Sequence, residues 1–353
     1  MTVCNACRYC EGFCPVFPAM ENRSAFSRSD LAYLANLCHN CGECLYACQY
    51  APPHEFGINV PRTLAQIRVA SYEEYCWPQG LSAAFAHQPL LAALALLAGF
   101  IAVFLTARTP LRETGLSGDF YQVIPHGVMV VLFAAASAFA LVALIVGCRR
   151  FWRGVPRERG LEKDSRPLFR ALRDALTLRH LHGGGVDCTD RPDARAPWRR
   201  WFHHATFYGF ALCFVSTSVA ALYHLVFGWR APYSYTSLPV VLGTAGGVGL
   251  LIGPSGLLLL RRKRDEALGD SAQVGLDVSF SLMLMLTSVT GLLLLVLRER
   301  SVMPALLMIH LGIVLALFLT LPYAKFVHGV YRVAALVTFA MESARIHKVR
   351  VGG

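Results

Sequence analysis

The chain has 353 residues, of which 55% are hydrophobic and only 16% are charged, and its mean hydropathy is +0.46. Soluble domains are about 45–50% apolar and about 25% charged, so this composition excludes an ordinary soluble enzyme, and the strong apolar blocks exclude a disordered chain. The net charge of +11 would suit a nucleic-acid-binding protein, but membrane proteins also concentrate Arg and Lys in the loops on one side of the bilayer.

Two copies of one cysteine pattern lie in the first 87 residues, before any long apolar block. In each copy three cysteines follow one another at intervals of three residues, and a fourth comes four residues later. Three thiolates at this spacing can hold one face of an iron–sulfur cube, while the fourth is displaced toward a second cube. The pattern therefore predicts two [4Fe–4S] clusters with crossed ligation. One set of ligands is Cys4, Cys7, Cys10 and Cys48, and the other is Cys38, Cys41, Cys44 and Cys14.

Disulfides and structural zinc are the alternatives for these cysteines. Disulfides are disfavoured because the charge distribution described below places this region in the reducing cytoplasm. Structural zinc usually pairs two C-x-x-C units across a longer gap, and these overlapping triplets would crowd one tetrahedral ion. Helices are expected at 29–37 and 58–75. The N-terminal region is therefore predicted to be a small helical ferredoxin-like head.

Six apolar runs follow the head, each long enough for a membrane-spanning helix of about 20 residues. They show no alternation of apolar and polar residues, which favours helices over barrel strands. The sequence thus predicts an all-α protein in which the helical 2x[4Fe–4S] head precedes a bundle of six transmembrane helices. The runs cover residues 88–107, 126–148, 203–228, 238–260, 278–297 and 303–324.

Arg and Lys are concentrated on one side of the predicted bundle. They crowd the linker 149–202, the link after the fourth run and the C-terminal segment, whereas the opposite loops carry few. The positive-inside rule places the head, the linker and both termini in the cytoplasm, as in a multi-pass protein of the bacterial inner membrane. This topology accounts for most of the net charge, so no nucleic-acid partner is expected. The predicted divisions are a cytoplasmic cluster domain (1–87), transmembrane helices one and two (88–148), a basic cytoplasmic linker (149–202), transmembrane helices three to six (203–330) and a cytoplasmic tail (331–353).

Histidines inside the predicted spans are candidate haem ligands, since ionisable residues within a membrane mark functional sites. The third run contains His203 and His224, and His310 in the sixth run is followed by His328 eighteen residues later. On one continuous helix, His310 and His328 would share a face. Because the third and sixth helices run in opposite directions, we expect His203 beside His328 near the cytoplasm and His224 beside His310 toward the outside. Paired imidazoles would bind haem b, with one and two haems both open, and an interfacial role is the alternative for each histidine.

Both cysteine segments carry a resemblance to a known family. Residues 4–21 (CNACRYCEGFCPVFPAME) and 38–56 (CHNCGECLYACQYAPPHEF) resemble the TcuB, or CitB-domain, family of tricarballylate-utilisation proteins. Residues 310–328 are similar to the haem-binding helix of the respiratory nitrate reductase cytochrome-b subunit. The resemblance implies an electron-transfer oxidoreductase subunit in the lipid bilayer. It would take electrons from the FAD of a partner tricarballylate dehydrogenase docked on the head and pass them through the clusters and haem to membrane quinone.

Two other functions remain open at this stage. The sequence contains no G-x-G-x-x-G fingerprint, so the chain is not expected to dehydrogenate a substrate alone. It would also suit an anchor subunit of another dehydrogenase or reductase, such as a heterodisulfide-reductase-like or fumarate-reductase-like complex. A sensor or transport component that uses its clusters as a switch is the third hypothesis. Histidines spread across the bilayer favour a relay over a switch.

Overall fold

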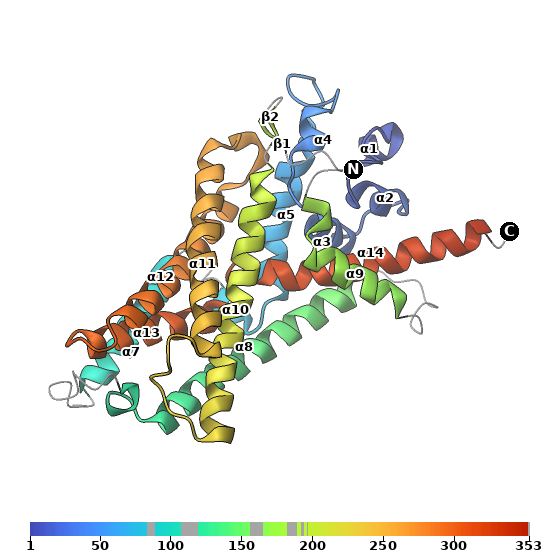
Figure 1. Ribbon diagram of the computed structural model, residues 1–353. Coiled ribbons are helices and arrows are strands. Elements are labelled where there is room, and N and C mark those ends of the chain that lie inside the picture. Colours follow the sequence, from blue (N-terminus) through green and yellow to red (C-terminus); the bar gives the residue numbers. More distant parts are fainter. Residues whose placement is uncertain are drawn as a thin grey trace.

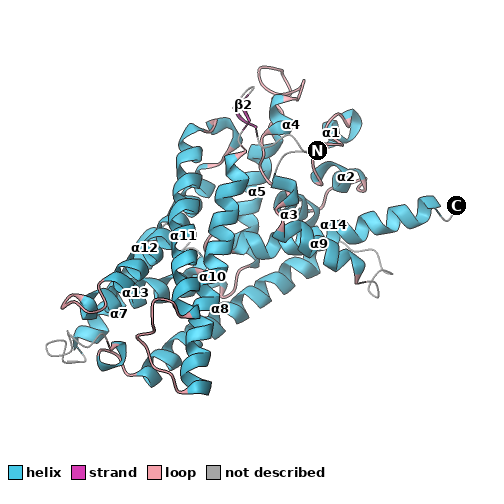
Figure 2. Cartoon of the chain, in the orientation of Figure 1, coloured by secondary structure: helices cyan, strands magenta, loops and turns pink. Residues whose placement is uncertain are grey.

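Helices make up nearly all of the regular structure. The computed structural model describes residues 1–82, 89–106, 119–155, 165–181, 189–191, 194–195 and 197–351. Within these ranges the strands are β1 (Thr189–Arg191) and β2 (Ala194–Arg195), which pair antiparallel in the linker. Figure 2 shows this small hairpin beside an otherwise helical chain. The predicted all-α fold is therefore confirmed.

The head is built from short helices around the cysteine loops. They are α1 (Thr2–Cys7), α2 (Val16–Glu21), α3 (Arg28–Leu37), α4 (Glu43–Tyr46) and α5 (Val60–Tyr75), followed by the 3-10 turn η1 (Gln79–Leu81). A capping box starts α3: the backbone N–H of Asp30 donates to the Ser27 hydroxyl, and the Ser27 N–H donates to the Asp30 carboxylate. Such reciprocal bonds satisfy donors that a helix start leaves free. The helices expected at 29–37 and 58–75 are confirmed within one or two residues.

Long apolar helices extend away from the head (Figure 1). Five of them are long and apolar enough to cross a membrane among the described residues: α8 (His126–Gly154), α10 (Trp198–Phe227), α11 (Leu238–Lys263), α12 (Ser271–Val296) and α13 (Met303–Thr320). The first predicted span, 88–107, is helical as α7 (Pro89–Thr106), and its two end residues lie outside the described residues. Shorter elements between these helices are η2 (Phe120–Gln122), α9 (Arg166–Leu176) and η4 (Glu266–Leu268).

Glycines bring α10 and α11 into close contact. A methyl group added to Gly246 would lie 2.8 Å from the backbone nitrogen of Cys213, and one added to Gly253 would lie 2.5 Å from that of Thr206. Real side chains do not fit at such distances, so these positions depend on the absence of a β-carbon. Small residues of this kind let membrane helices approach backbone to backbone.

The last apolar helix ends earlier than the sequence predicted. α13 stops at Thr320, and the chain turns through residues 321–326, which include Pro322, before α14 (Val327–Val351) begins. Proline cannot supply the N–H that would continue the helix. The expectation that His310 and His328 share one face of a continuous helix is therefore wrong. The segment 331–353, expected as a tail, contributes most of α14, which packs against α3, α8 and α9.

One apolar core joins the head to α8 and α14. It combines Tyr33 and Leu34 of α3 with Phe151 of α8 and with Tyr331 and Ala335 of α14, all of them buried. Burial of apolar surface is the main stabilising contribution to such a contact. The head is thus packed onto the helices behind it, and Figure 1 shows α14 crossing beneath it.

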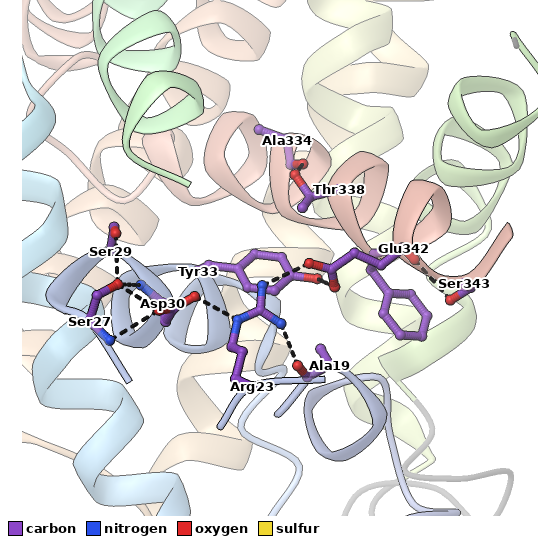
Figure 3. A network of polar contacts seen from close by, with 11 residues as sticks. Ala19, Arg23, Ser27, Ser29, Asp30, Tyr33, Ala334, Thr338, Glu342 and Ser343 are labelled. Carbon is purple, nitrogen blue, oxygen red and sulfur yellow. Dashed lines mark hydrogen bonds and ion pairs between the residues drawn. The ribbon is translucent and has the colours of Figure 1, made fainter. Parts of the chain in front are cut away.

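A polar clamp holds the head to α14 beside this core (Figure 3). The guanidinium of Arg23 pairs with Asp30 at 2.6 Å and with Glu342 of α14 at 2.7 Å, and it lies 4.7 Å from the ring centroid of Tyr33. The Tyr33 hydroxyl donates to the second carboxylate oxygen of Glu342 at 3.1 Å. Each charged group in the clamp therefore has a partner of opposite charge.

Candidate functional site

The four cysteines predicted for the first cluster, Cys4, Cys7, Cys10 and Cys48, converge on one cavity of about 280 Å³ near the N-terminus, and we call them the first thiol set. α1 carries two of them, the turn after α1 carries the third, and the fourth follows α4. Arg8, Tyr9, Gln49 and Tyr50 complete much of the wall. The side chain of Tyr9 is 67% exposed, so this set lies at the surface of the head.

Neighbouring thiols shape the ionisation of the first thiol set. Burial raises the pKa of Cys10 to about 12, and the thiols of Cys48, Cys4 and Cys7 add to the shift, as does the carboxylate of Glu43. Cysteines bind iron as thiolates, so cluster binding must displace these protons. The groups that act on Cys10 include all the other members of its predicted set, and Cys44 of the other predicted set also lines the cavity.

Cys14, Cys38, Cys41 and Cys44 form the second thiol set, which lies deeper. Burial raises the pKa of Cys14 well above its usual value, with further contributions from the thiols of Cys41 and Cys38. The same causes raise the pKa of Cys44, where the contributing thiols include those of Cys38 and Cys14. Each cysteine of both sets is free of disulfides. Across the described ranges, no three His, Cys, Asp or Glu side chains are placed to hold a single metal ion.

A tight loop presents the second thiol set. Asn40 has a φ of 53° and Gly42 a φ of 88°, both in the left-handed region. Glycine and asparagine adopt this region more readily than other residues. These two residues allow the chain to reverse direction between residues 38 and 44. The backbone carbonyls of Cys38 and Asn40 then accept hydrogen bonds from arginines of the membrane helices, as described below.

His203 and His328 face each other at the head-proximal end of the membrane helices. Their ring centroids are 5.9 Å apart, with an interplanar angle of 70°. Metal–imidazole bonds are about 2.0–2.1 Å long, so two axial imidazoles on one iron have centroids about 6 Å apart. Nδ1 of His328 donates to the backbone carbonyl of Lys325 at 2.5 Å, which leaves Nε2 available for a metal. This pair has the separation that a bis-histidine haem needs.

His224 and His310 have other neighbours. The ring of His224 stacks on that of His126 with centroids 3.5 Å apart, and Tyr121 lies against both. Nδ1 of His310 forms a 2.9 Å hydrogen bond with the hydroxyl of Thr290, and a methyl group on Gly291 would lie 3.0 Å from its ring. Of the two predicted pairs, the structure brings together His203 with His328.

Sequence reasoning did not select His126 as a site residue. It stands at the first residue of α8, while His224 stands near the last residues of α10. In two antiparallel helices, the start of one and the end of the other lie at the same depth in the membrane. The opposite directions of the second and third apolar runs were therefore the signal that could have paired His126 with His224.

Each histidine of the facing pair lies one helical turn from an arginine that contacts the second thiol set. Arg199, four residues before His203 on α10, donates to the carbonyls of Asn40 at 2.8 Å and His39 at 3.2 Å. Arg332, four residues after His328 on α14, donates to the carbonyl of Cys38 at 2.6 Å. From the sequence, both arginines were assigned to the charge bias that sets the membrane topology, because charge counts carry no information about hydrogen-bond partners.

Asp277 anchors the turn that precedes His328. Its carboxylate pairs with Arg261 of α11 at 2.5 Å and with Nζ of Lys325 at 2.7 Å. Lys325 also supplies the carbonyl that accepts from His328. The ion pairs therefore fix the residue that orients the imidazole, which is a positioning role for Asp277 through Lys325.

Comparisons with known proteins divide the chain in a similar way. The profile of the citrate utilization protein B Fer4-like domain matches residues 1–74, and that of citrate utilization protein B matches residues 81–348. The chain is 49% identical over 359 residues to the citrate utilization protein B of Escherichia coli, covering 100% of this chain and 93% of that protein. No solved structure matches the chain.

Proposed function

The chain belongs to the citrate utilization protein B family, and we propose that it is a membrane-bound electron-transfer protein. It takes electrons from the reduced FAD of a partner dehydrogenase and delivers them to the quinone pool. The Fer4-like domain indicates iron–sulfur chemistry, and the apolar helices are consistent with a membrane protein. When bound, two [4Fe–4S] clusters and haem b supply one-electron steps that no amino-acid side chain here supplies.

The observation that carries this proposal is the serial order of three centres. The first thiol set opens at the surface of the head, and the second thiol set lies deeper. Behind the second set, Arg199 and Arg332 connect its loop directly to the helices that carry His203 and His328. A relay needs closely spaced redox centres between its donor and its acceptor, and clusters at the two thiol sets with haem at the facing histidines would stand in that order.

The residues present fit the groups that the proposal requires. The first thiol set would hold one cluster and the second thiol set the other, in the crossed pattern that the spacing predicts. His203 and His328 would hold haem b. The buried Nε of Arg332 and the buried side-chain nitrogen of Asn40 have no hydrogen-bond partner within the described chain. Both are donors suited to the carboxylates that haem carries, and they lie beside the helices of the facing pair.

The exposed first thiol set indicates where the partner docks. Tyr9 and Phe56, 67% and 55% exposed, lie on this part of the head and suit the centre of a protein interface, where aromatic residues are enriched. Resemblance gives the partner's substrate as tricarballylate, and the name of the relative from E. coli refers to citrate, so we propose a tricarboxylate dehydrogenase. The head, both termini and the basic linker would face the cytoplasm in the bacterial inner membrane.

The decisive experiment is a reduced-minus-oxidised optical spectrum of the detergent-purified protein, with iron and haem assayed on the same sample. About eight non-haem irons together with a b-type haem signal are expected. Eight irons without haem would overturn the relay and favour a cluster-based sensor or transport component. Fewer than about four irons would overturn the assignment of both thiol sets. A haem-to-chain ratio of one is expected from the single facing pair, and a ratio of two would assign ligand roles to His224 and His310.

A further inference from the structure

The helix α9 of the basic linker has sides of different character, and it lies alongside α14 (Figure 1). One side, with Pro167, Ala171 and Asp174, is buried, and Ala171 belongs to the apolar core that joins the head to α14. Another side carries large apolar side chains that stay 40% to 72% exposed in the described structure. These are Leu168, Phe169, Leu172 and Leu176. At 100° per residue they fall within an arc of about 100°, and we call them the exposed apolar face of α9.

Arginines border the exposed apolar face. Arg170 and Arg173 are both exposed, and Arg173 lies one helical turn after Phe169. The acidic residue of α9 is Asp174, which lies on the buried side, 3.4 Å from Arg179 and 3.9 Å from Arg173. Leucine and phenylalanine on one side of a helix, with arginine beside them, are typical of helices that lie in the interface of a membrane.

The C-terminal end of α9 is fixed to α10 near the depth at which that helix enters the bilayer. The Tyr208 hydroxyl donates to the carbonyl of Leu176 at 3.0 Å, and Arg200 donates to the carbonyl of Thr177 at 3.3 Å. α10 has 30 residues and is therefore about 45 Å long, whereas the hydrocarbon core is about 30 Å thick. About ten residues of α10 must lie outside the core. They include the N-terminal turn with Arg199 and Arg200, because charged side chains are costly in hydrocarbon.

The exposed surface of α10 continues onto the exposed apolar face of α9. Trp201, Phe207 and Tyr208 are 68%, 40% and 44% exposed. Tryptophan and tyrosine are enriched where membrane helices pass from lipid into water. Leu176, whose carbonyl accepts from Tyr208, is itself a member of the face. The face therefore starts beside the aromatic surface of α10, at the level of lipid headgroups.

We propose that the exposed apolar face of α9 lies in the surface of the lipid bilayer, with its side chains among the acyl chains and with Arg170 and Arg173 at the phosphates of anionic lipids. Guanidinium groups form strong, charge-assisted hydrogen bonds with phosphate. The inference requires that the apolar helices cross a bilayer, and it does not depend on the clusters, the haem or the partner of the proposed function. Because α9 packs on α14, it would also hold the head at a fixed height above the membrane.

Photo-crosslinking of the full-length protein in vesicles of phosphatidylethanolamine and phosphatidylglycerol tests the proposal. The photoreactive residue p-benzoylphenylalanine replaces one exposed side chain at a time, and its ketone inserts into a neighbouring C–H bond on irradiation. In place of Phe169 or Leu172, it should give protein adducts with the mass of a phospholipid. Phe56 of the head, 55% exposed, is the matched control and should give no such adduct. Phe214 of α10, 53% exposed, is the positive control and should give one.

The three kinds of position separate the outcomes. Adducts with a second protein chain in place of lipid, at Phe169 and at Leu172, would overturn the proposal in favour of a protein interface. Lipid adducts at Phe214 but at neither position of α9 would contradict this inference alone. If Phe214 also failed to react with lipid, the membrane assignment would be wrong, and with it both this inference and the proposed function.

Arg170→Gln tests the preference for anionic lipid. An arginine near an anionic surface contributes about 1 kcal/mol, so the ratio of phosphatidylglycerol to phosphatidylethanolamine adducts at Phe169 should fall about fivefold. Arg62→Gln removes an exposed arginine from α5 of the head and is the matched control, with the ratio unchanged. An equal ratio in the two variants would contradict the contact between α9 and anionic lipid.

Discussion

The two thiol sets are each built around the same triplet of closely spaced cysteines, and they differ in the residues that surround that triplet. The first opens to solvent beside the exposed Tyr9. In the second, Cys38 and Cys41 are 7% and 8% exposed, and the carbonyls of Cys38 and Asn40 accept hydrogen bonds from Arg332 and Arg199. The spacing of the cysteines thus indicates iron–sulfur chemistry, and under the proposed function the surroundings would decide whether a site meets the partner or the next centre of the relay.

The two thiol sets differ because the residues around the first are close to it in the sequence, whereas those around the second come from distant helices. The wall of the first thiol set is drawn from residues 3–60 of the head itself. In the second set, Arg332 contacts Cys38 across 294 residues of sequence, and Arg264 contacts Asn40 across 224. Two copies of one local pattern can therefore come to lie in different surroundings when arginines of distant helices contact the loop of one of them.

The largest effect that tests the comparison is the loss of one cluster. Cys10→Ala and Cys14→Ala should each leave about four of eight irons and should abolish haem reduction by the partner, because either loss interrupts the series. The two variants should lose different resonance signals, and iron assays with spectroscopy of the purified protein would record this. Cys48→Ala should lose the same signal as Cys10→Ala, although Cys48 belongs to the second sequence copy.

Cys76→Ala is the matched control for these variants. Cys76 is a buried free thiol outside both copies, and its replacement should leave all irons in place. If Cys48→Ala instead removed the signal that Cys14→Ala removes, the ligation would not be crossed and the two thiol sets would have to be redrawn.

The next effect concerns the centre behind the second thiol set. His203→Ala and His328→Ala should each remove the haem b spectrum while leaving the iron content unchanged, because each deletes one of two facing ligands. His126→Ala is the control, since its ring stacks on another imidazole at a distance that leaves no room for an iron between them. A low-spin b-type spectrum that survived in both His203→Ala and His328→Ala would exclude this pair as the ligands.

The all-α fold, the iron–sulfur-type head and the apolar helices could be predicted from the sequence, because each depends on a pattern that lies within a short stretch of residues. The cysteine triplets were equally accessible, since their spacing is local, and the crossed ligation stays a prediction. The arrangement of His310 and His328 was not, because Pro322 and the turn around it end the helix between them. The hydrogen bonds of Arg199 and Arg332 to the loop of the second thiol set were also out of reach, because an arginine that contacts a carbonyl far along the chain has the same local sequence as one that faces lipid headgroups.

A smaller effect concerns the clamp of Arg23, Asp30 and Glu342 that holds the head to α14. Arg23 and Asp30 are 8% and 9% exposed, and removing one member of a buried pair destabilises a protein by roughly 3–5 kcal/mol. Arg23→Ala should therefore lower the free energy of unfolding of the head by about 3 kcal/mol. Arg28→Ala, in which an 82% exposed arginine loses its pairing with Glu74, should lower it by less than about 1 kcal/mol. Denaturant unfolding followed by cluster absorbance would separate them, and equal losses would contradict the buried clamp.

The smallest expected effect is at the exposed rim of the first thiol set. Tyr9→Ser removes an exposed aromatic residue from the surface where the partner is proposed to dock, and such residues each contribute about 1 kcal/mol or more to binding. The partner concentration for half-maximal haem reduction should rise about fivefold, with the maximal rate unchanged, since the substitution leaves every cysteine in place. Phe169→Ser on α9, at a residue that is 72% exposed, is the matched control and should leave both quantities unchanged. An equal rise in the two variants would move the docking surface away from the first thiol set, and with it the contrast between an exposed entry site and a buried exit site.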